Sequence, residues 1–247
     1  LVADRISDLL LTPDRLSSEN LRKEGVPEDK IVFTGNIMID TLENNRSKAA
    51  DLVIEDIITQ NLVDGNKLKP ICNKFADFAV MTLHRPSNVD KKEVLQPIVR
   101  FILDEVCSEI PLLWTIHPRT RKMLDSFGLL DEVMSNKNLF VLEPLGYLEM
   151  LKLNMHARVF LTDSGGLQEE CTVLGTPCLT LRWNTERPIT LAQYGGASVL
   201  VGNNITRISD EYHAALKKYR KPVVPELWDG HAAERCLEAI IGFKPTV

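Results

Sequence analysis

Features that would assign this 247-residue sequence to several large classes of protein are missing from it. No apolar run reaches the roughly 18 residues that a membrane-spanning helix needs. The first residues do not combine a basic segment with an apolar stretch, so we expect no secretory signal. Lysine and arginine are not concentrated in any one stretch, and 34 acidic residues outnumber 29 basic ones, for a formal net charge of −5. We therefore expect neither a membrane nor a nucleic acid as a partner.

Cysteine is sparse and forms no recognisable pattern. The sequence has an odd number of cysteines and no C-x-x-C pair; the five are Cys72, Cys107, Cys171, Cys178 and Cys236. This usage is typical of reduced thiols in a cytoplasmic protein, where most cysteines are small core residues. No cluster of His, Cys and Asp has the spacing of metal ligands, so we predict no metal and no other cofactor.

The sequence does contain the alternation of an α/β protein. Its composition, 44% apolar and 26% charged, is ordinary for a protein with a buried core. Short β-rich runs alternate with helical stretches, which is typical of a parallel sheet covered by helices. We predict six strands, at residues 78–83, 112–116, 139–142, 159–162, 178–181 and 199–201. Helices are predicted to begin near Asp90, Arg119, Tyr147, Gly166, Thr190, Ile208 and His231. These elements make one Rossmann-like domain of about 170 residues. Two shorter strands are predicted upstream, at residues 10–12 and 31–34, with a helix at 17–24 between them.

A sheet of this kind binds ligands at the carboxyl ends of its strands, and the loop after residue 162 has the composition of a phosphate site. Ser164, Gly165 and Gly166 open a helix there. Glycines allow close approach to the backbone, and the free amides of a helix N-terminus favour a diphosphate. Glu170, one to two turns into the helix, can accept hydrogen bonds from ribose hydroxyls. The alternative is an ordinary helix cap with a glycine turn.

A second polar loop, residues 182–188, follows the fifth predicted strand. It places Arg182, Thr185, Glu186 and Arg187 within a few residues of each other. Two guanidiniums with a carboxylate can form the fixed array that a diphosphate or sugar hydroxyls need. The alternative is a solvated loop with an internal pair between Glu186 and one of the two arginines.

Two histidine–arginine pairs end neighbouring strands. His84 is followed by Arg85, and His117 is followed two residues later by Arg119. A histidine at a strand end is well placed for acid–base work or for phosphate contact. A histidine satisfied by the backbone is the alternative for either one alone, but two such pairs at one edge favour a pocket.

Taken together, these segments resemble the signature segments of UDP-N-acetylglucosamine 2-epimerases, in the order and spacing of that family. The segments that carry the resemblance are Thr82-Leu-His-Arg, Ile116-His-Pro-Arg, Thr162-Asp-Ser-Gly-Gly-Leu-Gln-Glu-Glu170 and Asn184-Thr-Glu-Arg-Pro188. Leu200-Val-Gly202 and Trp228-Asp-Gly-His-Ala-Ala-Glu-Arg235 resemble the last strand and closing helix of the family. Ile6-Ser-Asp-Leu-Leu10 and Thr34-Gly-Asn-Ile-Met-Ile-Asp40 resemble the end of its first domain and the crossover between domains.

The resemblance implies the C-terminal half of a glycosyltransferase-B type two-domain fold. Residues 1–43 would be a remnant of the N-terminal Rossmann-like domain with the crossover, and residues 44–247 the C-terminal UDP-binding domain. The implied activity is inversion at C2 of UDP-GlcNAc to give UDP-ManNAc, by elimination of UDP to a 2-acetamidoglucal and re-addition. The implied setting is cell-surface polysaccharide biosynthesis in the cytoplasm, with UDP-GlcNAc and UDP as ligands and a homodimer as the full-length protein.

The resemblance also implies roles for individual residues. Ser164, Gly165 and Gly166 would hold the diphosphate, Glu170 the ribose and Arg187 the phosphates. His84 would be catalytic, at the diphosphate where leaving-group charge develops. Leu145 and Met150 would lie beside the uracil, mainly through backbone atoms. Further candidate contacts are Arg85, His117, Arg119, Arg182, Thr185 and Glu186.

Two departures from the family bear on activity. The acid–base residues that exchange the C2 proton belong to the first domain of the family, and this chain begins with Leu1 already inside a structured pattern. We therefore expect a truncated or processed chain that binds UDP weakly and does not turn over. Ser87 stands where many bacterial members have a glutamate of an allosteric UDP-GlcNAc site, which puts substrate activation in doubt.

Three alternatives remain open at the level of sequence. One is a hydrolysing 2-epimerase that releases free ManNAc and UDP. The second is a glycosyltransferase of the same architecture, which would share the diphosphate loop but need an acceptor. The third is a non-catalytic UDP-sugar-binding module.

Overall fold

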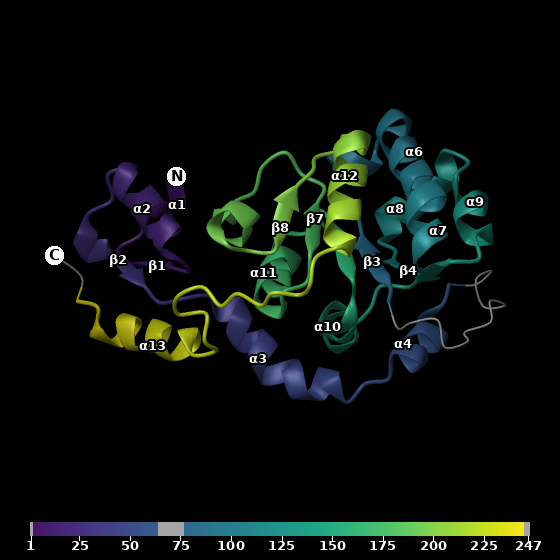
Figure 1. Ribbon diagram of the computed structural model, residues 1–247. Coiled ribbons are helices and arrows are strands. Elements are labelled where there is room, and N and C mark those ends of the chain that lie inside the picture. The colour runs from purple at the N-terminus through teal and green to yellow at the C-terminus, as the bar shows by residue number, and fades with distance from the viewer. Residues whose placement is uncertain (1, 64–76, 245–247) are drawn as a thin grey trace. The chain divides into compact units, whose positions relative to one another are not determined.

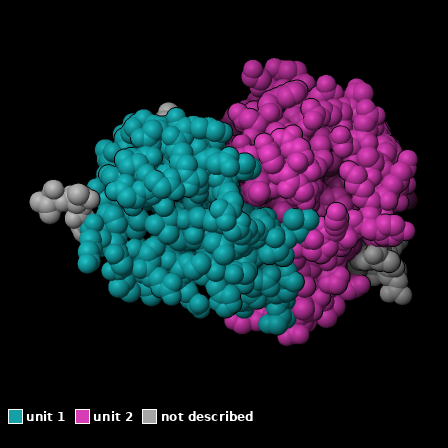
Figure 2. Space-filling model, turned by 60° about the vertical axis from the view of Figure 1, so that its left-hand side comes forward, with its two compact units in different colours: residues 1–47, 223–247 teal, residues 48–222 magenta. Residues whose placement is uncertain are grey.

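A computed structural model of the chain describes residues 2–63 and 77–244. The chain divides into two compact units, residues 1–47 with 223–247 and residues 48–222, which Figure 2 shows in different colours. In the described part, no helix is long and apolar enough to cross a membrane. Four cysteines there are free thiols, and Cys72 lies outside the described residues.

The second unit is built on a six-stranded parallel sheet with the strand order β5-β4-β3-β6-β7-β8 (Figure 1). Its strands are β3 (Ala79–Thr82), β4 (Leu112–Thr115), β5 (Leu139–Leu142), β6 (Val159–Thr162), β7 (Cys178–Thr180) and β8 (Ser198–Leu200). The chain starts at the centre with β3, moves outward to β5, and returns beside β3 with β6. This is the doubly wound order of Rossmann folds, and it confirms the predicted parallel α/β sheet.

The strands are continuous apolar runs because helices cover both faces of the sheet. Alternate side chains of one strand enter two separate cores: Met81 packs on one face and Val80 on the other. Figure 1 shows α6, α8, α9 and α12 on one side of the sheet and α4, α10 and α11 on the other. The helices of this unit are α4 (Ile54–Asn61), α5 (Pro86–Val89), α6 (Lys92–Phe101), α7 (Cys107–Glu109), α8 (Pro118–Ser126), α9 (Leu130–Ser135), α10 (Tyr147–His156), α11 (Gly165–Leu174) and α12 (Ile205–Leu216), with a π-helical turn at Ile102–Val106 between α6 and α7.

The first unit contains a two-stranded parallel sheet and helices from both ends of the chain. Its elements are α1 (Val2–Ile6), β1 (Leu10–Thr12), α2 (Arg15–Lys23), a 3₁₀ turn at Glu28–Lys30, β2 (Ile31–Phe33), the start of α3 (Ile37–Ala50), and α13 (Ala232–Gly242). The strands pair in register, Leu10 with Ile31 and Thr12 with Phe33. Asp14 caps α2 by accepting a hydrogen bond from the backbone N–H of Ser17 at 2.8 Å.

The predicted division at residues 43 and 44 differs from the compact units, because residues 223–247 join the first unit. Both carboxylate oxygens of Asp40 cap α13, accepting from the N–H of Ala232 at 3.0 Å and of Ala233 at 2.6 Å. The buried Trp228 indole donates to the carbonyl of Pro13 at 2.8 Å. These contacts join positions about 200 residues apart in sequence, which local sequence patterns do not reveal.

The prediction of a helix that begins near Thr190 is wrong. That region holds two 3₁₀ turns, Pro188–Thr190 and Ala192–Tyr194. The second turn ends at Gly195 in a left-handed conformation, with φ of 90°. The apolar pattern suggested a helix, but the helical backbone cannot continue through Gly195 and Gly196.

We expect Gly175→Ala to destabilise the protein far more than Gly128→Ala. Both glycines have positive φ, 72° and 69°, so both variants incur about 1 kcal/mol of left-handed strain. A Cβ at Gly175 would also overlap the backbone nitrogen of Pro222, whereas nothing lies within 4 Å of one at Gly128. Thermal or urea unfolding should show a loss above about 3 kcal/mol for Gly175→Ala. Equal losses in the two variants would contradict this packing.

Candidate functional site

The candidate residues of the second unit lie mainly in the loops at the carboxyl edge of its parallel sheet. His84 and Arg85 follow β3, His117 follows β4, and Ser164 follows β6. The segment from Arg182 to Arg187 follows β7 at the same edge. The strand order reverses between β3 and β6, and a doubly wound sheet has its ligand crevice at such a reversal.

Asp163 joins the two loops that meet at this reversal. Its carboxylate, fully buried, lies 2.9 Å from His84 Nδ1 and accepts the backbone N–H of Arg85 at 2.8 Å. It also accepts from the side-chain amide of Asn88 at 3.0 Å. Burial opposes the charge on Asp163, but the hydrogen bonds from His84, Arg85 and Asn88 hold its pKa below the usual range. The β3 loop is therefore clamped onto a carboxylate of the β6 loop.

His84 and His117 lie side by side, with ring centroids 5.5 Å apart. The His84 side chain is about one-third exposed (34%), so its ring borders solvent while Nδ1 contacts Asp163. His117 caps the N-terminus of α8 and accepts the N–H of Arg119 through Nδ1 at 3.1 Å. The guanidinium of Arg119 pairs with Asp90, at 2.7 Å from Nε to Oδ1. The structure thus brings the two histidines together and directs Arg119 toward a surface carboxylate.

The segment from Ser164 to Gly166 forms the N-terminus of α11. The first amides of a helix have no partner within it, and the side chain of Ser164 does not cap α11. A Cβ at Gly165 would lie 2.5 Å from Nη1 of Arg187, so this guanidinium covers the helix start at that point. Nothing lies within 4 Å of a Cβ built on Gly166. Space beside a helix N-terminus, with a guanidinium next to it, is an arrangement that can bind an anion.

Two arginines share one carboxylate beside α11. Nη2 of Arg182 lies 2.6 Å from Oε2 of Glu186, and Nη1 of Arg187 lies 2.6 Å from Oε1. The hydrogen bonds from Arg182, with the charges of both arginines, lower the pKa of Glu186 to about 2. Nε of Arg187 is also 3.0 Å from the nearly buried Glu169. The internal pair considered as an alternative for this loop therefore exists, in both of its forms.

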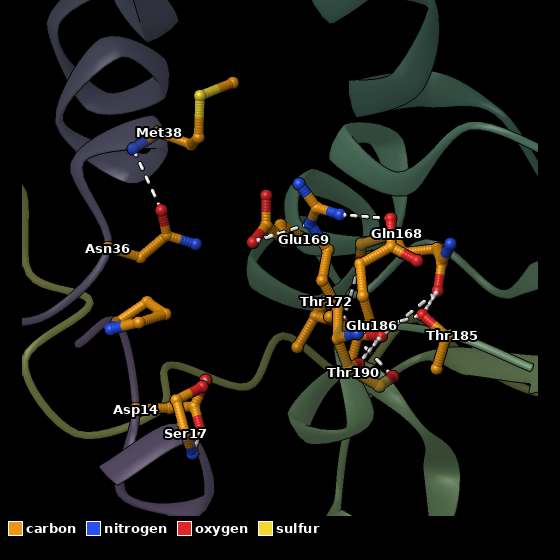
Figure 3. Close-up of polar contacts among 12 residues, drawn as sticks. Asp14, Ser17, Asn36, Met38, Gln168, Glu169, Thr172, Thr185, Glu186 and Thr190 are labelled. Atoms are coloured by element: carbon orange, nitrogen blue, oxygen red, sulfur yellow. Dashed lines mark hydrogen bonds and ion pairs between the residues drawn. The ribbon is translucent and has the colours of Figure 1, made fainter. Parts of the chain in front are cut away.

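Gln168 connects α11 to this polar loop. Its side-chain oxygen accepts from the hydroxyl of Thr185 at 2.9 Å, and its amide donates to the carbonyl of Ser164 at 3.2 Å. Figure 3 shows Gln168 with Thr185 and Thr190, whose hydroxyl donates to the same Gln168 oxygen at 3.4 Å. The predicted contact residue Thr185 thus holds the loop in place and also accepts the backbone N–H of Arg187 at 3.1 Å.

Glu170 lies deeper, in the middle of α11. It is 5% exposed, and burial raises the pKa of its carboxyl to about 7, although hydrogen bonds with Tyr147 and Asn154 oppose this rise. Burial, with the nearby Glu170 carboxylate, raises the pKa of Tyr147. Tyr147 begins α10, so Glu170 is tied to the segment that follows β5. The predicted uracil neighbours Leu145 and Met150 lie in that segment and pack against the core beneath it.

Comparison with known proteins identifies the family of the chain. The model of the UDP-N-acetylglucosamine 2-epimerase family matches residues 1–241. The chain belongs to the UDP-N-acetylglucosamine 2-epimerase family. It is 37% identical over 242 residues to the UDP-N-acetylglucosamine 2-epimerase of Methanocaldococcus jannaschii, covering 97% of this chain and 62% of that protein. The chain therefore spans less than two thirds of the length of this relative.

Two solved structures of this epimerase family are similar to the chain. The crystal structure of the M. jannaschii enzyme in complex with UDP-GlcNAc and UDP matches with a TM-score of 0.83 and 36% identity, over 97% of this chain and 62% of the other. The Neisseria meningitidis enzyme bound to UDP-GlcNAc matches with a TM-score of 0.78 and 28% identity, over 98% and 63%. The predicted glycosyltransferase-B type of fold is confirmed by these neighbours.

Sequence reasoning missed several residues of the candidate site. Asp163, Asn88, Gln168 and Glu169 were not among the candidates, although each lies in or beside a candidate loop. Asp163 ends a buried strand directly before Ser164, which is a detectable signal of a strand-end functional group. Asn88 gives no such signal, because its partners Asp163 and Leu181 lie 75 and 93 residues away in the sequence. Gln168 lies inside a candidate loop, but its bonds to Thr185 and Thr190 depend on how the next loop folds. In the described ranges, 2–63 and 77–244, no group of three or more His, Cys, Asp or Glu side chains is placed to hold a metal.

We expect Asn88→Asp to make the stability of this chain of the epimerase family depend on pH. The new carboxylate would stand near 3.0 Å from Asp163, and mutual repulsion raises the pKa of one of them above its unfolded value. The folded state then binds more protons than the unfolded state, so stability is lost as pH rises through that raised pKa. The melting temperature of Asn88→Asp should fall, relative to the parent, between about pH 5 and pH 8.

Asn88→Ala is the matched control for this pH test. It removes the same hydrogen bonds, including the one to the carbonyl of Leu181 at 2.8 Å, and costs about 1–3 kcal/mol without adding a charge. Its loss should stay constant with pH. A constant loss in Asn88→Asp as well would mean that the two side chains do not meet in the folded protein.

Proposed function

We propose that this chain carries the UDP-binding part of a UDP-N-acetylglucosamine 2-epimerase, which interconverts UDP-GlcNAc and UDP-ManNAc. The observation that carries the proposal is the helix start at Ser164, Gly165 and Gly166, with Arg187 against it and His84 tied to the preceding residue, Asp163. These groups would together bind a diphosphate. The similar M. jannaschii and N. meningitidis enzymes, crystallised with UDP-GlcNAc, support the same ligand.

The diphosphate would lie over the amides of Gly166 and its neighbours. The partial positive charge of the α11 N-terminus and the guanidinium of Arg187 both favour its negative charge. Glu186 lies 2.6 Å from Nη1 of Arg187, so a phosphate oxygen would replace this carboxylate there. The ribose would lie toward Glu170, whose carboxylate can accept hydrogen bonds from two hydroxyls.

The reaction would proceed in two reversible steps. Loss of the C2 proton with cleavage of the bond from C1 to the phosphate oxygen releases UDP and leaves 2-acetamidoglucal. Addition of UDP back to C1, with a proton delivered to the other face of C2, completes the inversion. The residues of this chain act on the UDP side, where they stabilise the charge that grows on the departing diphosphate.

We expect Gly166→Ala to weaken UDP binding while the fold stays intact. The added methyl group fills the open space above the helix amides, and alanine in a helix is slightly stabilising relative to glycine. Calorimetric titration with UDP should show a loss of at least about tenfold in affinity for this variant and for Arg187→Ala. The melting temperature of Gly166→Ala should not fall.

Gly242→Ala is the matched control for this titration. Gly242 is the last residue of α13 and, like Gly166, has nothing within 4 Å of its Cβ position. It belongs to the first unit and to no candidate loop. Its UDP affinity should equal that of the parent. UDP binding that survives both Gly166→Ala and Arg187→Ala unchanged would move the nucleotide away from α11 and overturn the proposal.

The pH dependence of UDP binding should report Glu170. Because its pKa is raised to about 7, the carboxyl is ionised above this pH and protonated below it. The ionised form accepts both ribose hydroxyls, so affinity should fall by up to about tenfold between pH 8 and pH 6. The titration of the UDP phosphates is common to parent and variant. Glu170→Gln should therefore bind more weakly and show a smaller change with pH, and an identical pH profile would exclude Glu170 from the site.

Activity is tested separately from binding. UDP-GlcNAc in deuterated water, with no acceptor added, is incubated with this chain and with a relative of full length. Appearance of UDP-ManNAc carrying deuterium at C2 identifies an epimerase, whereas free ManNAc with UDP identifies the hydrolysing reaction. A glycosyltransferase would form neither product without an acceptor. The predicted homodimer stays a prediction, which size-exclusion chromatography with light scattering would test.

A further inference from the structure

The two oxygens of the buried Asp163 carboxylate have different neighbours. Oδ2 receives the backbone N–H of Arg85 at 2.8 Å, the side-chain amide of Asn88 at 3.0 Å and the backbone N–H of His84 at 3.1 Å. Oδ1 lies 2.9 Å from Nδ1 of the His84 ring and 3.1 Å from the same backbone N–H. Oδ1 is therefore the oxygen that faces the imidazole.

The donors around Oδ2 cannot reverse their roles. Two of them are backbone amides, which only donate. The third is the Asn88 amide group, whose nitrogen also donates to the carbonyl of Leu181 at 2.8 Å. Turning the Asn88 side chain over would lose both of these bonds. The position of Oδ2 therefore suits an acceptor oxygen, and an N–H donor there would face three other donors.

We infer that Asp163 is a positioning residue that keeps a proton on Nδ1 of His84, so that Nε2 is the ring nitrogen that serves the ligand. An ionised carboxylate only accepts hydrogen bonds, so the ring nitrogen facing it must donate. A neutral imidazole then carries its lone pair on Nε2. The contact also fixes the orientation of the ring, as second-layer carboxylates do for catalytic histidines.

This inference rests on the proposed function for what Nε2 does there. When the bond from C1 to the phosphate oxygen breaks, a protonated Nε2 would donate to the departing diphosphate oxygen. If the proton transfers, the ring is left neutral with its proton on Nδ1, still facing Asp163. Re-addition of UDP returns the proton to Nε2. Asp163 stays ionised throughout, which agrees with the lowered pKa of its carboxyl.

Asp163→Asn tests the inference, because it changes a single atom of the carboxylate. The three donors require the new amide oxygen at the position of Oδ2, so the NH₂ group must take the position of Oδ1. It would then donate to Nδ1 and move the ring proton of neutral His84 to Nε2. Long-range proton–nitrogen spectra of ¹⁵N-histidine-labelled chain at about pH 8 distinguish the two tautomers, and His84→Gln assigns the signal.

The expected result is a proton on Nδ1 in the parent and on Nε2 in Asp163→Asn. Asp90→Asn is the matched control, because Asp90 pairs with Arg119 and should leave the His84 tautomer unchanged. A parent chain with the His84 proton on Nε2 overturns the inference even if the variant does not fold. An unchanged tautomer in a folded Asp163→Asn overturns it as well.

Addition of UDP to the labelled parent separates this inference from the proposed function. A ¹⁵N shift at Nε2 of His84 with Nδ1 unchanged supports both. If UDP does not bind, the proposed function fails while the tautomer result still decides the role of Asp163. A larger shift at Nδ1 than at Nε2 would show that the carboxylate does not hold that nitrogen, and would overturn the inference.

Discussion

The candidate site depends on one buried charge, the carboxylate of Asp163. A carboxylate without exposure to water is stable only when it is paired and hydrogen-bonded, and this one has a histidine, two backbone amides and a side-chain amide around it. These partners belong to the loop and helix after β3, while Asp163 belongs to the loop after β6. The need to satisfy one charge therefore sets the relative position of two segments about 80 residues apart.

The reversal of strand order makes this contact possible. β3 and β6 are adjacent in the sheet, and the helices that follow them pack on different faces. The loops after the two strands therefore border one crevice at the carboxyl edge of the sheet. His84 and the N-terminus of α11 are brought together there by topology. Around them the chain uses a second polar network, in which Gln168 and Thr185 hold Arg187 against Gly165. The two networks order the side chains around the proposed anion site, and such ordering reduces the cost of binding.

Much of the fold was predictable because its signals are local. The central strands are unbroken apolar runs ending in polar residues, and the observed bounds of β5 and β6 are those predicted. The two 3₁₀ turns after Arg187 were not predictable in the same way, since a short apolar pattern does not show that Gly195 ends the second one after a single turn. Nor did any pattern show that α13 is capped by Asp40, because that contact closes a loop of about 190 residues.

The sequence alone determined the family of the chain and the position of the candidate loops along it. Motifs and strand ends consist of consecutive residues, so both can be recognised without the fold. The state of the site was decided by tertiary structure. Only there is Glu170 buried, with a pKa raised to about 7, and Glu186 held between two arginines with a pKa near 2. The two glutamates differ because packing against residues distant in sequence, such as Tyr147, decides that Glu170 is buried, whereas the fold of the loop decides that both neighbouring arginines reach Glu186.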